Sequence, residues 1–221
     1  MPLYIISTPI GNLKDITLRA LDALKDSELI LAEDTRRTSI LLNHYNIKNK
    51  LISFNDYNKE KKTNSIISEL KDNKKIGLVS DSGTPGISDP GFYLVRGAVK
   101  HGIEIIPIPG PTASIAALIS SGFPTDSFIF YGFIPKKEKA KIDFFKEIEN
   151  NNKTTIIYES PHRLLKTLKT MSEIMPDREI CVAREITKKF EEFLRGTTKE
   201  IYNKLENRKI KGEITITINK N

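Results

Sequence analysis

Short apolar runs alternate along this chain with stretches in which apolar residues recur at helical spacing, and this alternation constrains the fold more than any other feature. The runs are rich in Ile, Leu, Val and Tyr, as expected of strands buried on both faces of a sheet. They cover residues 3–7, 28–32, 50–54, 76–80, 104–108, 127–131, 154–158, 180–183 and 213–218. The helical patterns cover residues 18–24, 65–70, 92–99 and 164–171. The alternation predicts an α/β fold with largely parallel or mixed sheets.

A boundary between two domains is predicted near residue 111, where Pro109-Gly110-Pro111 interrupts the pattern. The 221 residues are enough for two small α/β domains, which we assign to residues 1–111 and 112–221. Two helix starts are also marked, because Asp89 before Pro90 and Ser160 before Pro161 each fit an N-cap followed by the first helical position.

The composition argues against a membrane-spanning, secreted or disulfide-bonded protein. No stretch approaches the roughly 20 apolar residues that would span a membrane. Residues 1–12 have no charged region and are broken by Pro9 and Gly11, unlike a signal peptide. The single cysteine, Cys181, excludes an internal disulfide and a thiolate-rich zinc site. A reducing cytoplasm is therefore the expected compartment.

The net charge of +7 leaves two interpretations open. It favours a polyanionic partner such as a nucleic acid. The lysines of residues 58–63 and 136–146, however, lie among Asn, Asp and Glu, which is equally typical of a solvated lysine-rich surface. Charge alone does not decide between the two.

Polar or glycine-rich turns directly follow several of the apolar runs. They are residues 7–12, 33–37, 80–85, 109–112, 159–163 and 184–188. Ligands bind outside the carboxyl ends of strands in open parallel sheets, so these turns are expected at one edge of each sheet. Structural turns use Gly, Pro, Asn and Asp and have no need of the charged residues found here, which are Glu33, Arg36, Arg37, Glu159, His162, Arg163, Arg184 and Glu185. We interpret the turns as a binding or catalytic site.

Missing motifs exclude several kinds of site. There is no phosphate-binding G-x-x-x-x-G-K-[ST] loop and no G-x-G-x-x-G dinucleotide fingerprint. No group of His and carboxylate residues has metal-ligand spacing, so no metal is predicted, and no G-x-S-x-G nucleophile elbow occurs. Gly83 and Gly86 either let a ligand approach the backbone closely or form a tight turn before the helix expected at Pro90.

At these turns the sequence resembles the bacterial ribosomal RNA small-subunit methyltransferase I family, which belongs to the tetrapyrrole-methylase-like (class III) methyltransferases. The motifs that carry the resemblance are LYIISTPIGNL (3–13), AEDTR (32–36), VSDSGTPGISDPG (79–91), PGPTA (109–113), YESPHR (158–163) and AREITK (183–188). They follow in the family's order and extend the resemblance from residue 3 to about residue 218. Ser82 stands where the family has alanine.

The resemblance implies two α/β domains of the tetrapyrrole methylase type, a cleft between them that binds S-adenosylmethionine, and a homodimer. It also implies the activity, which is 2′-O-methylation of a cytidine in the decoding region of 16S rRNA in the small ribosomal subunit. By the same resemblance the cofactor contacts Thr8, Pro9, Ser80, Asp81, Ser82, Gly83, Thr84, Pro85, Ser88, Thr112, Ala113 and Ala116. The chemistry of these residues agrees, because small side chains and Asp81 suit a compact, neutral-to-cationic ligand.

Methyl transfer to a ribose hydroxyl requires positioning and a base or nearby cation, because the neutral hydroxyl is a poor nucleophile. The catalytic candidates are Glu33, Asp34, Glu159, Glu185 and Lys188. We expect Glu33 and Asp34 to lie nearest the acceptor hydroxyl, but the sequence does not single out one base.

Several cations are expected to bind the RNA backbone or polarise the hydroxyl. These residues are Arg36, Arg37, His162, Arg163 and Arg184. Local structural roles stay open for two residues of the same turn, because Asp34 would also cap a helix that starts at Thr35 and Arg36 would also pair with a carboxylate.

Two other functions are compatible with the same features. One is a tetrapyrrole-precursor methylase of the same fold, against which the arginine-rich turns argue. The other is a non-catalytic ribosome assembly factor, against which the intact loop at residues 80–85 argues. Thermal stabilisation by S-adenosylmethionine would separate an enzyme from a pure binding factor.

Overall fold

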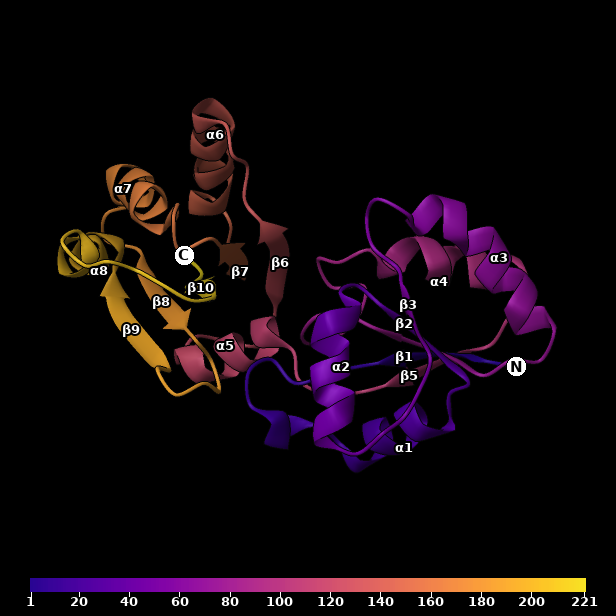
Figure 1. Cartoon of the computed structure of the whole chain (residues 1–221). Coiled ribbons are helices and arrows are strands. Elements are labelled where there is room, and N and C mark those ends of the chain that lie inside the picture. The colour runs from indigo at the N-terminus through magenta and orange to yellow at the C-terminus, as the bar shows by residue number, and fades with distance from the viewer. The chain divides into compact units, whose positions relative to one another are not determined.

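The computed structural model describes the whole chain, Met1–Asn221, and divides it into two compact units, Met1–Thr112 and Ala113–Asn221 (Figure 1). Each unit contains one five-stranded sheet with helices on both faces. The predicted α/β fold is therefore confirmed. No helix is both long enough and apolar enough to cross a lipid bilayer.

The first unit alternates strands and helices throughout. Its elements are β1 (Leu3–Ile6), a short 3-10 helix (Leu13–Asp15), α1 (Leu18–Asp26), β2 (Leu29–Ala32), α2 (Thr35–His44), β3 (Leu51–Ser53), α3 (Lys59–Lys71), β4 (Ile76–Val79), α4 (Gly91–Lys100) and β5 (Ile105–Ile108). The strand order is β3-β2-β4-β1-β5, and every pair is parallel.

Two apolar layers enclose this sheet, one on each face. Leu3 packs in the first layer with Leu70 of α3 and Leu94 of α4. Ile6, which points to the opposite face, packs in the second layer with residues of α1 and α2 such as Leu24. Figure 1 shows α1 and the pair α3 and α4 on opposite sides of the strands. Because both faces are covered and all strands are parallel, the five carboxyl ends, which precede helices or the domain boundary, are left at one free edge.

Side-chain caps fix where several helices begin. The Asp34 carboxylate accepts the N–H of Arg36 and caps α2, as the sequence suggested. Helix α4 begins at Gly91, one residue later than predicted, although the Asp89 carboxylate still accepts the Gly91 N–H at 3.1 Å.

The helix start predicted at Ser160 and Pro161 is wrong, because α7 begins only at Leu164. The carbonyl of Ser160 accepts the N–H of Arg163 at 3.0 Å, a bond that closes a tight turn before the first regular helical turn.

The second unit begins with a helix and has a less regular order. Its elements are α5 (Ala113–Ser121), β6 (Phe128–Phe133), α6 (Glu138–Glu149), β7 (Thr154–Glu159), α7 (Leu164–Ile174), β8 (Glu179–Arg184), β9 (Glu192–Thr197), α8 (Thr198–Leu205) and β10 (Ile214–Ile218). Helix α8 starts in a capping box, in which Thr197 and Glu200 exchange side-chain and backbone hydrogen bonds.

The second sheet is mixed, with the order β6-β7-β10-β8-β9. Strands β6 and β7 are parallel, whereas β10 lies antiparallel between β7 and β8, and β9 is antiparallel to β8. Strand β9 was not predicted, because only Leu194 of its six residues is buried. The antiparallel directions place the ends of β7 and β8 beside the starts of β10 and β9.

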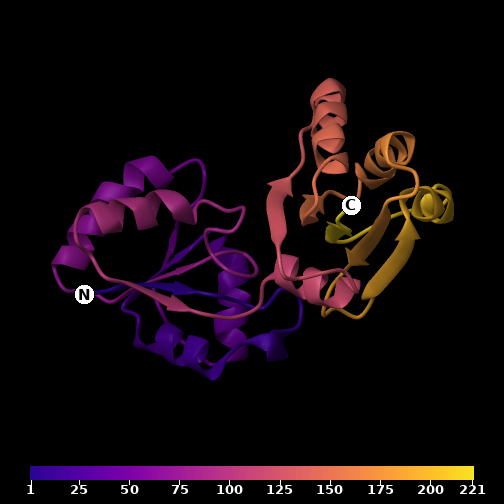
Figure 2. The same cartoon turned by 180° about the vertical axis from the view of Figure 1, so that it is seen from behind.

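Helices cover both faces of this sheet as well (Figure 2). Phe145 of α6, Leu168 of α7 and Ile201 of α8 share one apolar core with the inner residues of the strands. Helix α5 contacts β7, β8 and β10. The polar turns after β7 and β8 therefore lie at an edge of the sheet that is not covered by these helices.

Candidate active site

Three loops meet at the carboxyl edge of the first sheet, and we call residues 7–12, 80–88 and 109–112 the loop layer. They follow the adjacent strands β1, β4 and β5. Thr8 and Gly83 exchange backbone hydrogen bonds of 2.9 and 3.0 Å, so the first two loops pair like strands. The three turns thus lie together at the carboxyl edge of the parallel sheet, as predicted.

Hydroxyl groups join the loop layer into one network. The Thr84 hydroxyl lies 3.0 Å from that of Ser7 and 2.7 Å from that of Thr112. The Ser80 hydroxyl donates to the carbonyl of Ser82 at 3.2 Å, within its own loop. Each of the three loops therefore contributes side chains or carbonyls to the same set of hydrogen bonds.

Two glycines permit the close approach of these loops. Gly83 has a φ of +81°, a conformation that a side chain disfavours. Gly110 faces Ser7 so closely that an added Cβ would lie 2.8 Å from the Cβ of Ser7. Substitution at either glycine would separate the loops from one another.

The loop layer contains no lysine or arginine. Its one charged side chain is Asp81, with Asp89 directly after it, and most of its other polar groups are hydroxyls and backbone amides. Burial is the main cause that raises the pKa of Asp89, whose carboxylate accepts the N–H groups of Gly86 and Gly91. This set of groups suits a neutral or cationic ligand with hydroxyls, and is unlike a phosphate site.

Two carboxylates join the neighbouring strands β2 and β4, and we call Glu33 and Asp81 the carboxylate clasp. The Glu33 carboxylate accepts the backbone N–H of Asp81 at 3.3 Å, and the Asp81 carboxylate accepts the backbone N–H of Asp34 at 2.9 Å. The reciprocal bonds hold Glu33 beside the loop layer.

The other charged residues of the same turn pair with carboxylates. Arg36 binds Asp34 through two hydrogen bonds, of 3.0 and 2.6 Å. Arg37 lies 3.5 Å from Asp81. Both arginines remain largely exposed, with 88% and 61% of their side chains accessible. They are therefore still open to an anionic partner.

In the second unit, Glu159 and Arg163 form a buried ion pair at the end of β7. The Glu159 side chain is fully buried, and its two oxygens lie 3.2 Å from Nε and Nη2 of Arg163. Thr167 donates to the same carboxylate at 2.6 Å. Arg163 also donates to the carbonyls of Ile134 and Pro135. The pair joins β7, α7 and the loop after β6.

Glu185 and Lys188 form a second ion pair, after β8. The Lys188 ammonium lies 2.8 Å from Glu185 and 3.1 Å from Glu213. The Glu185 carboxylate also accepts the backbone N–H of Glu213 at 2.9 Å. Glu185 and Thr187 both have positive φ values, of 52° and 67°, so this turn is held in an uncommon conformation.

Arg184, at the end of β8, takes part in a third cluster of charged side chains. Its Nε lies 3.1 Å from Glu192, which also binds Arg208 at 3.0 Å. The Glu192 pKa is lowered, first by its hydrogen bond to Arg208 and, against the effect of burial, also by Arg184. Arg184 therefore has its charge partly balanced.

The remaining predicted residues occupy three places. Ser88 has a φ of 65° in the loop before α4, near Pro85 and the exposed Ser82. Pro9 is buried after Thr8. In the second unit, His162 is exposed in the turn before α7, and Ala113 and Ala116 lie on α5.

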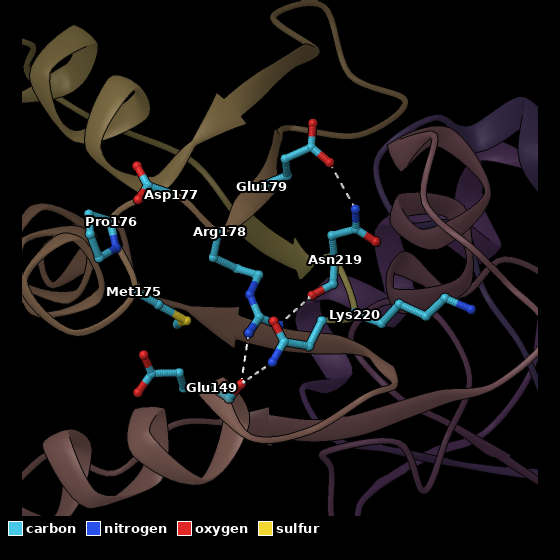
Figure 3. A pocket seen from close by; sticks show the side chains of 9 residues that line it. Glu149, Met175, Pro176, Asp177, Arg178, Glu179, Asn219 and Lys220 are labelled. Atoms are coloured by element: carbon cyan, nitrogen blue, oxygen red, sulfur yellow. Dashed lines mark hydrogen bonds between the residues drawn. The ribbon is translucent and has the colours of Figure 1, made fainter.

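A pocket of about 390 Å³ lies elsewhere in the second unit, at the start of β8 and the end of β10 (Figure 3). Arg178 donates there to the carbonyls of Glu149 and Asn219, and burial lowers its pKa. None of the predicted site residues lines this pocket. The structure contains no group of three or more His, Cys, Asp or Glu side chains placed to hold a metal ion.

Comparison with known proteins identifies the family. Over residues 2–202 the sequence matches the tetrapyrrole (corrin/porphyrin) methylases. It is 48% identical to the ribosomal RNA small subunit methyltransferase I of Halalkalibacterium halodurans, across 99% of this chain and 76% of that protein. The identity to the protein of the same name from Thermotoga maritima is also 48%, across 98% of this chain and 97% of the relative. The chain belongs to the ribosomal RNA small subunit methyltransferase I family.

A solved structure shows the same fold. It is that of uroporphyrin-III C-methyltransferase from Thermus thermophilus complexed with S-adenosyl homocysteine, with a TM-score of 0.66 and 15% sequence identity. The match covers 98% of this chain and 97% of the other. The tetrapyrrole methylase fold and the family predicted from the motifs are thereby confirmed.

The pKa values separate three of the candidate carboxylates of this methyltransferase I family member. The Glu33 pKa is raised, mainly by burial and also by the charges of Asp81 and Asp89, although the Asp81 N–H opposes the shift. The Asp34 pKa is lowered to about 2, mainly by its hydrogen bond from Arg36. Burial would raise the Glu185 pKa, but Lys188 and the Glu213 N–H bring it below its usual value. Of these three, only Glu33 has a pKa above its usual value.

Four residues that the sequence analysis did not single out contact the candidate residues. Ser7 and Gly110 belong to the loop layer, Thr167 binds Glu159, and Glu192 binds Arg184. Gly110 had a visible signal in the motif Pro109-Gly110-Pro111. The others are ordinary residues whose roles depend on partners distant in the sequence.

Gly212 is a further such residue, and its replacement by alanine is expected to lower the free energy of unfolding by about 2 kcal/mol. Its φ is +96°, and an added Cβ would overlap the Glu185 side chain. Urea unfolding checks the loss. The control is Gly102→Ala, at a φ of +68° with open space around it, which should cost only about 1 kcal/mol. Equal losses in the two variants would contradict the steric explanation.

Proposed function

We propose that this chain is an S-adenosylmethionine-dependent methyltransferase that methylates the 2′-hydroxyl of a cytidine in the decoding region of 16S rRNA in the small ribosomal subunit. Membership of the ribosomal RNA small subunit methyltransferase I family supports ribosomal RNA as the methyl acceptor. The observation that carries the proposal is the loop layer, in which hydroxyls and the Asp81 carboxylate gather without any lysine or arginine, next to Glu33 of the carboxylate clasp.

The groups of the loop layer fit S-adenosylmethionine. The ligand carries a positive sulfonium and an ammonium group, which Asp81 complements, and ribose hydroxyls, which serine and threonine side chains complement. We assign its binding to Thr8, Pro9, Thr112 and the residues of 80–88 named above, and to Ala113 and Ala116 of α5. When bound, the cofactor supplies an electrophilic methyl group on sulfur.

Glu33 is the base in this proposal. Its carboxylate would accept the proton of the ribose hydroxyl as the oxygen is methylated, so a pKa above the usual value for glutamate improves proton transfer. Asp34 keeps its charge balanced by Arg36 and has a less basic carboxylate. It therefore serves in this proposal to cap α2 and to orient Arg36.

The charged residues of the second unit divide into two roles under the same proposal. Arg184, Lys188 and His162 bind RNA phosphates, as do Arg36 and Arg37 of the first unit. Glu159 and Arg163 act as positioning residues, because most of their polar atoms are bound within the protein. Glu185 positions Lys188.

The decisive experiment is incubation with labelled S-adenosylmethionine and small subunits from cells that lack the endogenous enzyme, followed by nuclease mapping of the label. The expected result is label on the ribose of one cytidine of 16S rRNA. Label on a tetrapyrrole precursor instead would overturn the function but keep the fold. Thermal unfolding adds a second readout, since the cofactor should stabilise an enzyme and leave a pure assembly factor unchanged.

Two broader properties belong to the same proposal. Action on ribosomal RNA implies a cytoplasmic enzyme, and the resemblance to the family implies a homodimer. The exposed apolar side chains Phe92 and Val99 of α4 provide a surface that a second copy would cover.

A further inference from the structure

A group of exposed cations lies on the second unit, and we call it the lysine patch. It consists of residues from the loop between β6 and α6, the first turn of α6, the turn before α7, and the outer face of α7: Lys136, Lys137, Lys139, His162, Lys166 and Lys169. All are exposed, and none takes part in an ion pair. The proposed methyl transfer does not use the lysines of this patch.

Tertiary contacts, and not sequence alone, bring these residues together. Arg163 binds the carbonyls of Ile134 and Pro135, which fixes the start of α7 beside the loop that carries Lys136. Further along, the Thr170 hydroxyl of α7 donates to Glu138 of α6 at 3.0 Å. Figures 1 and 2 both show α6 and α7 side by side.

The charge of the one carboxylate within the patch, that of Glu138, is balanced by an ion pair. Glu138 lies 3.0 Å from the ammonium of Lys141, a buried lysine with only 5% of its surface exposed. Lys141 also donates to the carbonyl of Lys166 at 3.5 Å. The hydrogen bond from Lys141 is the main cause that lowers the Glu138 pKa. The nearest further acids along the two helices, Asp143 and Glu173, lie one turn beyond the patch.

We propose that the lysine patch binds consecutive phosphates of the ribosomal RNA substrate. This inference rests on the function proposed above and adds a contact surface to it. Several uncompensated ammonium groups in succession match a polyanionic backbone, which loses counterions when lysines neutralise its phosphates. The exposed residues of α7 are Lys166, Lys169 and Glu173, with no large apolar side chain among them, which favours RNA over a membrane surface.

The test compares two triple variants of equal charge change. The patch variant is Lys136→Gln with Lys137→Gln and Lys139→Gln. The control variant is Lys153→Gln with Lys199→Gln and Lys204→Gln, at exposed and unpaired lysines of the same unit outside the patch. Binding of each protein to purified small ribosomal subunits is measured between 50 and 200 mM salt.

The patch variant should bind more weakly, and the slope of log K against log salt concentration should become shallower by about 2 to 3. The control variant should keep the wild-type slope. Calorimetry should show unchanged affinity for S-adenosylmethionine in both variants, which establishes that each remains folded and able to bind the cofactor.

The outcomes separate this inference from the proposed function. If the patch variant keeps the slope and affinity of the control variant, the lysine patch is not an RNA surface, while methylation by the wild type still stands. If the wild type binds subunits with the expected salt dependence but transfers no methyl group to them, the function is overturned and the patch remains.

Discussion

Replacement of Glu33 with glutamine is expected to slow methyl transfer by about 10²- to 10⁴-fold, the usual contribution of a general base, without loss of the fold. The amide oxygen of glutamine is still able to accept the Asp81 N–H, so the bond between β2 and β4 is preserved. What is lost is the site that takes the proton. Single-turnover assays with small subunits measure the rate, and cofactor calorimetry shows whether binding persists.

The pH dependence of the Glu33→Gln variant provides an independent check. The Glu33 pKa is raised in the folded protein, so the fold favours the neutral acid. The resulting contribution to stability is present below the pKa of the unfolded chain and is lost as pH rises through the raised folded pKa. The melting temperature of the variant relative to the wild type should therefore be higher at pH 8 than at pH 4.

The matched control is Asp34→Asn, another carboxylate-to-amide change in the next residue. Asparagine also caps helices, and the Asp34 pKa of about 2 makes it a weak base. Turnover should change little. If Asp34→Asn loses as much turnover as Glu33→Gln, or if Glu33→Gln keeps full turnover, Glu33 is not the base.

The second large effect is on stability, since Arg163→Met should lower the free energy of unfolding by about 3 kcal/mol. The substitution leaves the buried Glu159 carboxylate without its cation, with only Thr167 and the Ser160 N–H as partners. It also frees the carbonyls of Ile134 and Pro135. Urea unfolding followed by circular dichroism measures the loss.

The appropriate control for this experiment is Arg208→Met. Arg208 also pairs with a glutamate, but 42% of its side chain is exposed, and Glu192 keeps Arg184 as a partner. Its loss should be at most about 1 kcal/mol. The double variant Glu159→Gln with Arg163→Met should be less destabilised than the sum of its single variants, because both remove the same interaction. Additive losses would show that the two side chains act separately.

Periodicity was sufficient to predict most of the fold. Strands such as β1 and β4 are buried on both faces, and each forms a continuous apolar run. Strand β9 was missed because it is an edge strand with few buried residues. It is formed by its backbone pairing with β8, which leaves no apolar pattern in the sequence. The antiparallel direction of β10 was also not predicted, since an apolar run such as 214–218 has no mark of strand direction.

The site was predictable to the level of its turns but not of its contacts. The order of strands and turns places Glu33, Asp81 and Thr84 at one edge. Whether a glutamate after a strand faces solvent or is buried depends on its tertiary partners. For Glu159, these partners are Arg163 and Thr167, which occupy both oxygens of the carboxylate. The motif at 158–163 alone does not indicate that the Glu159 side chain is buried.

The position of β10 has a consequence for biosynthesis. Residues 214–218 form the middle of the second sheet, between β7 and β8. In a nascent chain, the first sheet is complete once β5 has been made, whereas β7 and β8 have no strand between them until β10 emerges. The first unit is thus able to fold while the ribosome is still translating, whereas in the second unit β7 and β8 must each wait with one edge unpaired. The demand for chaperones should therefore be concentrated on the second half of the chain, in the interval just before β10 is inserted.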